Sequence, residues 1–214
     1  MHAYLALGDS YSIGEGVAAT ARWPVQLAAR LRARGIALGE PRIIATTGWT
    51  TDELAAAMDA TTFAPPCALV SLMIGVNDQY RGHAPEQMLR TFERLLRRAI
   101  ALAGDDSSRV LVPSIPDWGA TPFGLASGRD RQVVSAQIDA CNHGQRECVQ
   151  RHGAHWIDVT AASRAMADEP ALVADDGLHP SATMHQRWVE LIAPVAQARL
   201  AATAVSGGAG AAPR

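Results

Sequence analysis

The chain has 214 residues, of which 48% are hydrophobic, and its formal net charge is −2. This length is sufficient for one domain with a substantial core. The near-neutral charge gives no electrostatic reason to expect nucleic acid or an anionic membrane as a partner, and the longest apolar run, roughly ten residues, is too short to span a bilayer.

Strands and helices are expected to alternate along the chain. The expected strands cover residues 4–8, 41–46, 68–75, 109–113 and 155–159, and the expected helices cover residues 23–34, 51–60, 85–103, 130–152 and a last segment capped by Ser181. This alternation predicts an α/β fold: a three-layer α/β/α sandwich around a flavodoxin-like, five-stranded parallel sheet. Residues 1–200 are expected to form one domain, and the Gly/Ala-rich residues 201–214 a disordered tail.

Three polar residues at the two ends of this pattern suggest a nucleophilic enzyme. Ser10 follows the first strand, whereas Asp176 and His179 share a loop before the last helix. A serine hydroxyl becomes a good nucleophile when a histidine removes its proton and a carboxylate fixes the histidine's tautomer. Both segments also have the composition of ordinary turns, so neither is decisive alone. Asp176 is preferred to Asp175 because of its spacing from the histidine.

Two further segments lie between them. Gly48 precedes a helix whose start is marked by the capping pair Thr50 and Glu53, so it lies where backbone N–H groups are unpaired. Asn77 follows the buried third strand, and its amide could donate a hydrogen bond to an oxyanion. A tight strand-to-helix turn at Gly48 and a strand-ending turn at Asn77 are the structural alternatives.

Taken in order, Gly8-Asp9-Ser10, Gly48, Gly75-Val76-Asn77-Asp78 and Asp176-Gly177-Leu178-His179 resemble the four signature blocks of the SGNH (GDSL-type) hydrolases. The resemblance extends from Leu5 to about Leu200. It implies that Ser10 is the nucleophile, that Asp176 and His179 complete a triad, and that Ser10, Gly48 and Asn77 form the oxyanion hole. Tyr11 departs from the family, whose name implies leucine at that position.

The resemblance implies a serine hydrolase of carboxylic esters that acts through an acyl-serine intermediate without cofactor or metal. The expected partner is a small-molecule ester, and short acyl or acetyl esters are favoured because few large apolar loop residues remain for a long acyl tunnel. An acyltransferase, a thioesterase or a lysophospholipase could use the same triad, and a non-catalytic binding protein could keep the fold. Trp118 and Phe123, in a long loop over residues 114–124, and Trp49 are candidate pocket residues, although these aromatic side chains could equally anchor loops.

The remaining polar residues are given structural roles. Asp9 and Asp78 are expected to hold loops together through backbone hydrogen bonds. His152 and His155 have the spacing of some metal ligands but no evident acidic or thiol partner, so a surface position is expected for them. The same is expected for three other histidines: His83, His143 and His185.

Cysteine usage and the N-terminus bear on location. The three cysteines, Cys67, Cys141 and Cys148, are expected to be reduced, since the last two lie on one helix about 10 Å apart. Met1 leads almost directly into a strand without a signal segment, so a cytoplasmic protein is expected. The oligomeric state is not predicted.

Overall fold

The computed structural model describes residues 1–207. Within this range, five parallel strands form one sheet in the order β2-β1-β3-β4-β5. Their bounds are His2–Gly8 (β1), Leu38–Ala45 (β2), Leu69–Met73 (β3), Val110–Pro113 (β4) and His155–Ile157 (β5). The predicted parallel sheet is confirmed.

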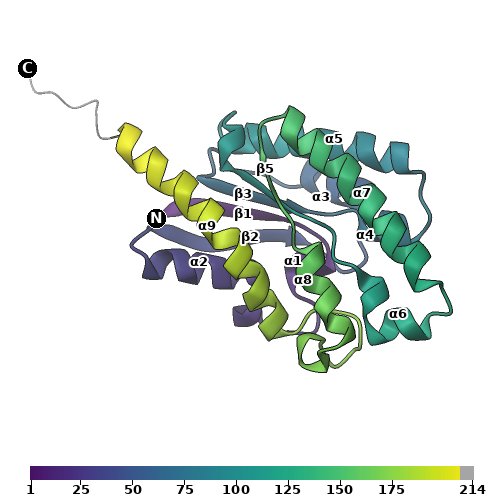
Figure 1. The fold of residues 1–214 in the computed structure, drawn as a ribbon. Coiled ribbons are helices and arrows are strands. Elements are labelled where there is room, and N and C mark those ends of the chain that lie inside the picture. The colour runs from purple at the N-terminus through teal and green to yellow at the C-terminus, as the bar shows by residue number, and fades with distance from the viewer. Residues whose placement is uncertain (208–214) are drawn as a thin grey trace, which may run out of the picture.

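Helices cover both faces of the sheet (Figure 1). α2 (Trp23–Ala33) and α9 (Ala182–Gly207) pack together on one side, and α3 (Thr51–Asp59), α5 (Pro85–Leu102) and α7 (Arg131–Arg151) pack side by side on the other. Four short helices lie at the ends of strands: α1 (Ser10–Ile13), α4 (Val76–Tyr80), α6 (Pro122–Ala126) and α8 (Thr160–Ser163). The capping pair at the start of α3 is present as predicted, with reciprocal bonds between Thr50 and Glu53.

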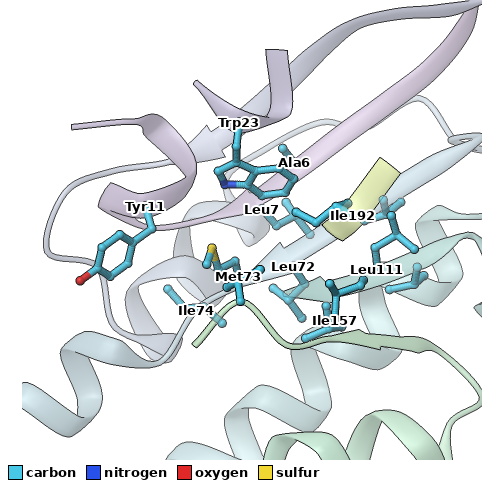
Figure 2. Packing of buried hydrophobic residues seen from close by; sticks show 14 of the residues in the cluster. Ala6, Leu7, Tyr11, Trp23, Leu72, Met73, Ile74, Leu111, Ile157 and Ile192 are labelled. Carbon is cyan, nitrogen blue, oxygen red and sulfur yellow. The ribbon is translucent and has the colours of Figure 1, made fainter. Parts of the chain in front are cut away.

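The core lies between the sheet and these two helical layers. Figure 2 shows Ala6 and Leu7 of β1 beside Leu72 of β3, with Trp23 of α2 and Ile192 of α9 packed against them. Every residue of β3 is buried, as expected for a central strand covered on both faces. α5 presents an apolar face to this core; Met88, Phe92, Leu95, Leu96 and Ala99 are all buried.

The structure differs from several of the predicted boundaries, and these are the main differences. β2 begins at Leu38 and includes Pro41, which is tolerated because β2 is an edge strand. β3 ends at Met73, before Gly75. The predicted loop over residues 114–124 contains a 3₁₀ helix at Trp118–Ala120 and the first turn of α6. α9 continues past residue 200 to Gly207, and residues 208–214 of the predicted tail lie outside the described residues.

The register of the sheet explains why distant segments meet. Gly8 at the end of β1 pairs with Ala45 at the end of β2 and with Met73 at the end of β3. The chain therefore leaves all three strands at one edge, which is where open α/β sheets bind ligands. No helix within residues 1–207 is long and apolar enough to cross a membrane.

Candidate active site

Ser10 is the first residue of α1 and lies at the carboxyl end of β1. The Asp9 carboxylate caps this short helix by accepting the Tyr11 N–H at 3.0 Å. A Cβ atom on Gly8 would collide with the Ser12 hydroxyl and the Met73 carbonyl, so only glycine allows this tight exit from the strand. Ser10 is 5% exposed, which leaves its hydroxyl in a sheltered position at the sheet edge.

Asp176 and His179 are joined by a local network within one loop. Asp176 Oδ2 lies 2.6 Å from His179 Nδ1, and Asp176 Oδ1 accepts the backbone N–H groups of Leu178 and His179, each at 2.9 Å. A bridge between Val173 and Pro180 closes the loop at its ends. The carboxylate that contacts the histidine is therefore Asp176, as the spacing predicted.

The electrostatics favour an ionised Asp176. Partial burial acts to raise its pKa, but the hydrogen bonds from the His179 ring and from the Leu178 and His179 backbone together hold that pKa below its ordinary value. Once ionised, the carboxylate fixes the proton of the imidazole on Nδ1 and leaves Nε2 free to accept a proton.

Tyr11 packs against this pair. Its ring meets the His179 ring edge-on, with centroids 5.8 Å apart, and the Trp188 ring at 6.1 Å. Burial, reinforced by nearby carboxylates, raises the pKa of Tyr11 above its ordinary value, so the ring is a neutral wall beside the imidazole. The larger side chain at this position thus packs against the His179 ring at the cavity wall.

The turn that carries Gly48 is held by hydrogen bonds from a residue of α4 and from the residue that follows this helix. Gly48 has φ +86°, in the left-handed region that favours glycine. Arg81 Nη2 donates to the Gly48 carbonyl at 2.6 Å, and Asn77 Nδ2 donates to the Trp49 carbonyl at 2.9 Å. Within residues 1–207 the Gly48 N–H itself donates no hydrogen bond.

Asn77 and Asp78 lie in the first turn of α4, which begins at Val76 directly after Gly75. Asn77 is half-buried, and since an amide nitrogen carries two hydrogens, its bond to Trp49 leaves one free. Asp78 is 2% exposed and accepts the Thr51 N–H at 2.8 Å and the Thr51 hydroxyl at 2.9 Å. The predicted roles of Asp9 and Asp78 in holding backbone segments are confirmed.

One cavity of about 180 Å³ brings the candidate residues together. It is lined by Ser10, Gly48, Asn77 and His179, with Asp176 behind His179. Among the described residues no hydrogen bond joins the Ser10 hydroxyl to the His179 ring; such bonds are often long in unliganded enzymes and tighten when substrate binds.

The predictions for the three candidate pocket residues have different outcomes. Trp118 and Phe123 line this cavity, Trp118 being fixed by its indole N–H, which donates to Gln79 Oε1 at 2.8 Å. Trp49 does not line it; its side chain is half-buried and packs against the core. The sequence missed Tyr80, which also lines the cavity, because a helix as short as α4 carries no periodic signal.

Two predictions about histidines are wrong. His185 is fully buried, where its Nδ1 accepts the Trp23 N–H at 3.2 Å. His152 does have acidic and thiol neighbours: its Nε2 lies 3.0 Å from Glu93 Oε1, and one potential metal-ligating atom from each of Glu93, Cys148 and His152 lies within 4.8 Å of the others. Glu93 also forms an ion pair with Arg97. We therefore interpret this cluster as an ion-pair network that holds α5 against α7. The three cysteines are free and buried, as predicted.

Comparisons with known proteins identify a family and several structures of similar fold. The model of the GDSL-like lipase/acylhydrolase family matches residues 6–187. No relative was found among the curated proteins.

Several solved structures share the fold. TesA superimposes with a TM-score of 0.72 at 21% identity, over 92% of this chain and 99% of that one. Axe2, an acetylxylan esterase from Geobacillus stearothermophilus, gives 0.66 at 18% identity over 93% and 94%. A lipase/acylhydrolase from Enterococcus faecalis gives 0.65 at 21% identity over 93% and 97%. At these identities the likeness is one of fold. The family match, which covers most of the chain, shows that this protein belongs to the GDSL-like lipase/acylhydrolase family.

Proposed function

We propose that this protein hydrolyses carboxylic esters of short acyl groups through an acyl-serine intermediate. The observation that carries the proposal is the shared cavity: a sheltered serine, a carboxylate-paired imidazole, an unpaired backbone N–H and an amide side chain all border the same 180 Å³. Few reactions other than acyl transfer use these four groups together.

In the proposed first step His179 Nε2 removes the Ser10 proton as the serine oxygen attacks the ester carbonyl. The carbonyl oxygen gains negative charge, which the N–H groups of Ser10 and Gly48 and the Asn77 amide would stabilise. Asp176 orients the imidazole and stabilises its cation. When the tetrahedral intermediate collapses, the protonated His179 delivers its proton to the departing alcohol.

The second step reverses these roles with water. His179 removes a proton from water, the resulting nucleophile attacks the acyl-serine carbonyl, and the same donors hold the second oxyanion. Collapse releases the carboxylic acid and returns the proton to Ser10. No cofactor enters either step.

The size of the cavity supports the short-chain preference. Pockets for drug-sized ligands are typically about 300–1,000 Å³, whereas the candidate cavity has 180 Å³ and is bounded by the rings of Tyr11, Tyr80, Trp118 and Phe123. With these side chains in place, the room beside Ser10 suits an acetyl or similarly small acyl group.

The test is covalent labelling. Incubation with a p-nitrophenyl phosphonate should stop hydrolysis of p-nitrophenyl acetate, and peptide mass mapping should place the adduct on Ser10. Ser10→Ala should remain folded, remain unlabelled and lose hydrolysis, whereas Ser12→Ala serves as the neighbouring serine control. An adduct on another residue, or full activity of Ser10→Ala, would remove the proposed nucleophile. Added acceptor alcohols, with products analysed, separate hydrolysis from acyl transfer.

A further inference from the structure

A second and larger cavity adjoins the candidate active site. It has a volume of about 740 Å³ and lies between the α4–α5 connection and α7. Tyr80 lines both this groove and the 180 Å³ cavity that holds Ser10. The two spaces are therefore neighbours, and the Tyr80 side chain forms part of the wall of each.

The groove has an apolar interior and a polar rim. Met88, Leu89, Val134 and Cys141 contribute apolar lining, of which Met88, Val134 and Cys141 are buried. Exposed polar side chains, among them Arg129 and Asp130, lie at its border. Its volume falls in the usual range of small-molecule sites, which are mostly apolar with a few polar groups.

The Tyr80 side chain, which borders both cavities, is able to move. Its ring meets Trp118 edge-on at 5.2 Å and lies 6.3 Å from Phe123. Trp118 is 2% exposed and held by Gln79, whereas Tyr80 is 39% exposed and its hydroxyl has no hydrogen-bond partner among the described residues. The Arg129 guanidinium covers the Tyr80 ring at 4.4 Å and contacts the Trp118 ring at 5.4 Å. Arg129 Nη1 also donates to the Tyr80 carbonyl at 3.0 Å, but this bond holds the backbone and not the ring. Cation–π contacts at exposed sites are weak, about 0.5–1 kcal/mol, so the ring can turn away from the guanidinium.

Exposed apolar side chains gather at the mouths of the two cavities. In the part of the chain whose burial is described, the large hydrophobic residues with high exposure include Tyr80, Phe123, Leu125 and Val133. Tyr80 and Phe123 line the small cavity, Val133 lines the groove, and Leu125 shares α6 with Phe123. Scattered exposed hydrophobic residues need no explanation, but a group around a cavity mouth is typical of a site for an apolar ligand.

We propose that the groove binds the distal part of an unbranched hydrocarbon chain of the ester substrate, and that Tyr80 determines which chain lengths reach it. This inference rests on the proposed function. With Tyr80 in its observed position, Ser10 is accessible to short esters; when the ring turns away, the small cavity opens into the groove. Each methylene buried there is worth about fourfold in kcat/KM.

The experiment compares p-nitrophenyl acetate with p-nitrophenyl octanoate. Tyr80→Ala should raise the octanoate-to-acetate ratio of kcat/KM by at least tenfold, because a few additional methylenes become buried at about fourfold each. Adding Ala140→Trp, an exposed position that borders the groove, should bring the ratio back towards that of the wild type. Ala136→Trp, an exposed position on the same helix outside the lining, is the matched control and should leave the ratio of Tyr80→Ala unchanged.

A parallel series of n-alkyl acetates tests which side of the ester enters the groove. If the acyl chain enters, only the octanoyl series responds to Tyr80→Ala and Ala140→Trp; if the alkoxy chain enters, the octyl acetate series responds. An unchanged ratio in both series, or an equal response to Ala136→Trp, would overturn the proposal.

A binding measurement separates this proposal from the proposed function. Ser10→Ala in the Tyr80→Ala background should bind decanoate, measured by calorimetry, at least tenfold more tightly than it does with Ala140→Trp added. If decanoate binding follows this pattern but the protein with Ser10 intact hydrolyses no ester, only the proposed function is contradicted. If esters are hydrolysed but Ala140→Trp leaves decanoate binding unchanged, only the proposal about the groove is contradicted.

Discussion

The loop of Asp176 and the turn of Gly48 border the same cavity but are held in different ways. Every bond that shapes the Asp176 carboxylate comes from a residue two or three positions away. The Gly48 turn is fixed by Asn77 and Arg81, whose donors come from 28 and 33 positions further along the chain. The contacts of the Asp176 carboxylate thus lie within its own loop, whereas the turn depends on how β2, β3 and α4 assemble.

The largest effect should follow from breaking the short-range motif. Asp176→Asn keeps an oxygen for the Leu178 and His179 N–H groups but places an N–H donor against His179 Nδ1, which favours the wrong tautomer. We expect kcat for p-nitrophenyl acetate to fall by about 10⁴-fold with little change in melting temperature. Asp175→Asn, an exposed neighbour, is the matched control and should keep full activity. A loss of less than tenfold in Asp176→Asn would mean that His179 does not need this carboxylate.

Asn77 holds the Gly48 turn and also lines the cavity, so its removal should have the next largest effect. Asn77→Ala deletes both the bond to the Trp49 carbonyl and the free amide hydrogen facing the cavity. We expect kcat to fall by about 10²–10³-fold, the usual value of one oxyanion donor, with a smaller change in KM. Steady-state kinetics across substrate concentrations separates the two constants. Unchanged turnover would remove Asn77 from the mechanism.

The same difference explains what the sequence could predict. The Asp176 and His179 pair and the capping box at Thr50 and Glu53 follow from spacings of three residues, and both are present. The parallel sheet followed from the alternation of apolar segments. Arg81 was missed and His185 was misplaced because their partners are distant in the chain: Arg81 meets Gly48, and His185 meets Trp23 across 162 positions. No local pattern carries such contacts.

A substitution of Arg81 tests one long-range contact of the Gly48 turn while Asn77 stays in place. Its guanidinium bonds the Gly48 carbonyl and also lies 3.3 Å from Glu53, and the pair is about half exposed. Because exposed ion pairs contribute little, Arg81→Gln should leave the melting temperature nearly unchanged. Loosening the turn should lower kcat by about tenfold, or about 1.4 kcal/mol, with KM unchanged.

Two further variants show whether Arg81 acts by positioning. Arg81→Lys keeps the charge but cannot hold two acceptors with one planar group, so we expect partial activity. Arg90→Gln removes an exposed arginine from α5 and should have no effect on kcat. If Arg90→Gln and Arg81→Gln reduce kcat equally, net charge rather than the Gly48 turn is responsible.

The smallest effect on turnover should come from His185, on the helix that follows the His179 loop. Burial lowers the pKa of His185 to about 3, with a smaller contribution from His179, whereas in the unfolded chain it is about 6.5. The unfolded state therefore binds a proton that the folded state excludes. The stabilisation that comes from keeping His185 neutral is fully present above pH 6.5 and is lost as the pH falls towards 3. By pH 5 the loss in the free energy of unfolding amounts to about 2 kcal/mol.

His185→Asn retains an acceptor for the Trp23 N–H but cannot titrate. Between pH 7.5 and pH 5 its free energy of unfolding, from urea denaturation, should therefore fall by about 2 kcal/mol less than that of the wild type. Turnover at pH 8 should stay within about twofold of the wild type, because the Asp176 loop is shaped by its own residues. Equal pH dependence in the two proteins would show that His185 is not buried in its neutral form. A large loss of turnover would show that the loop depends on the packing of α9 after all, and the distinction between the two regions would fail.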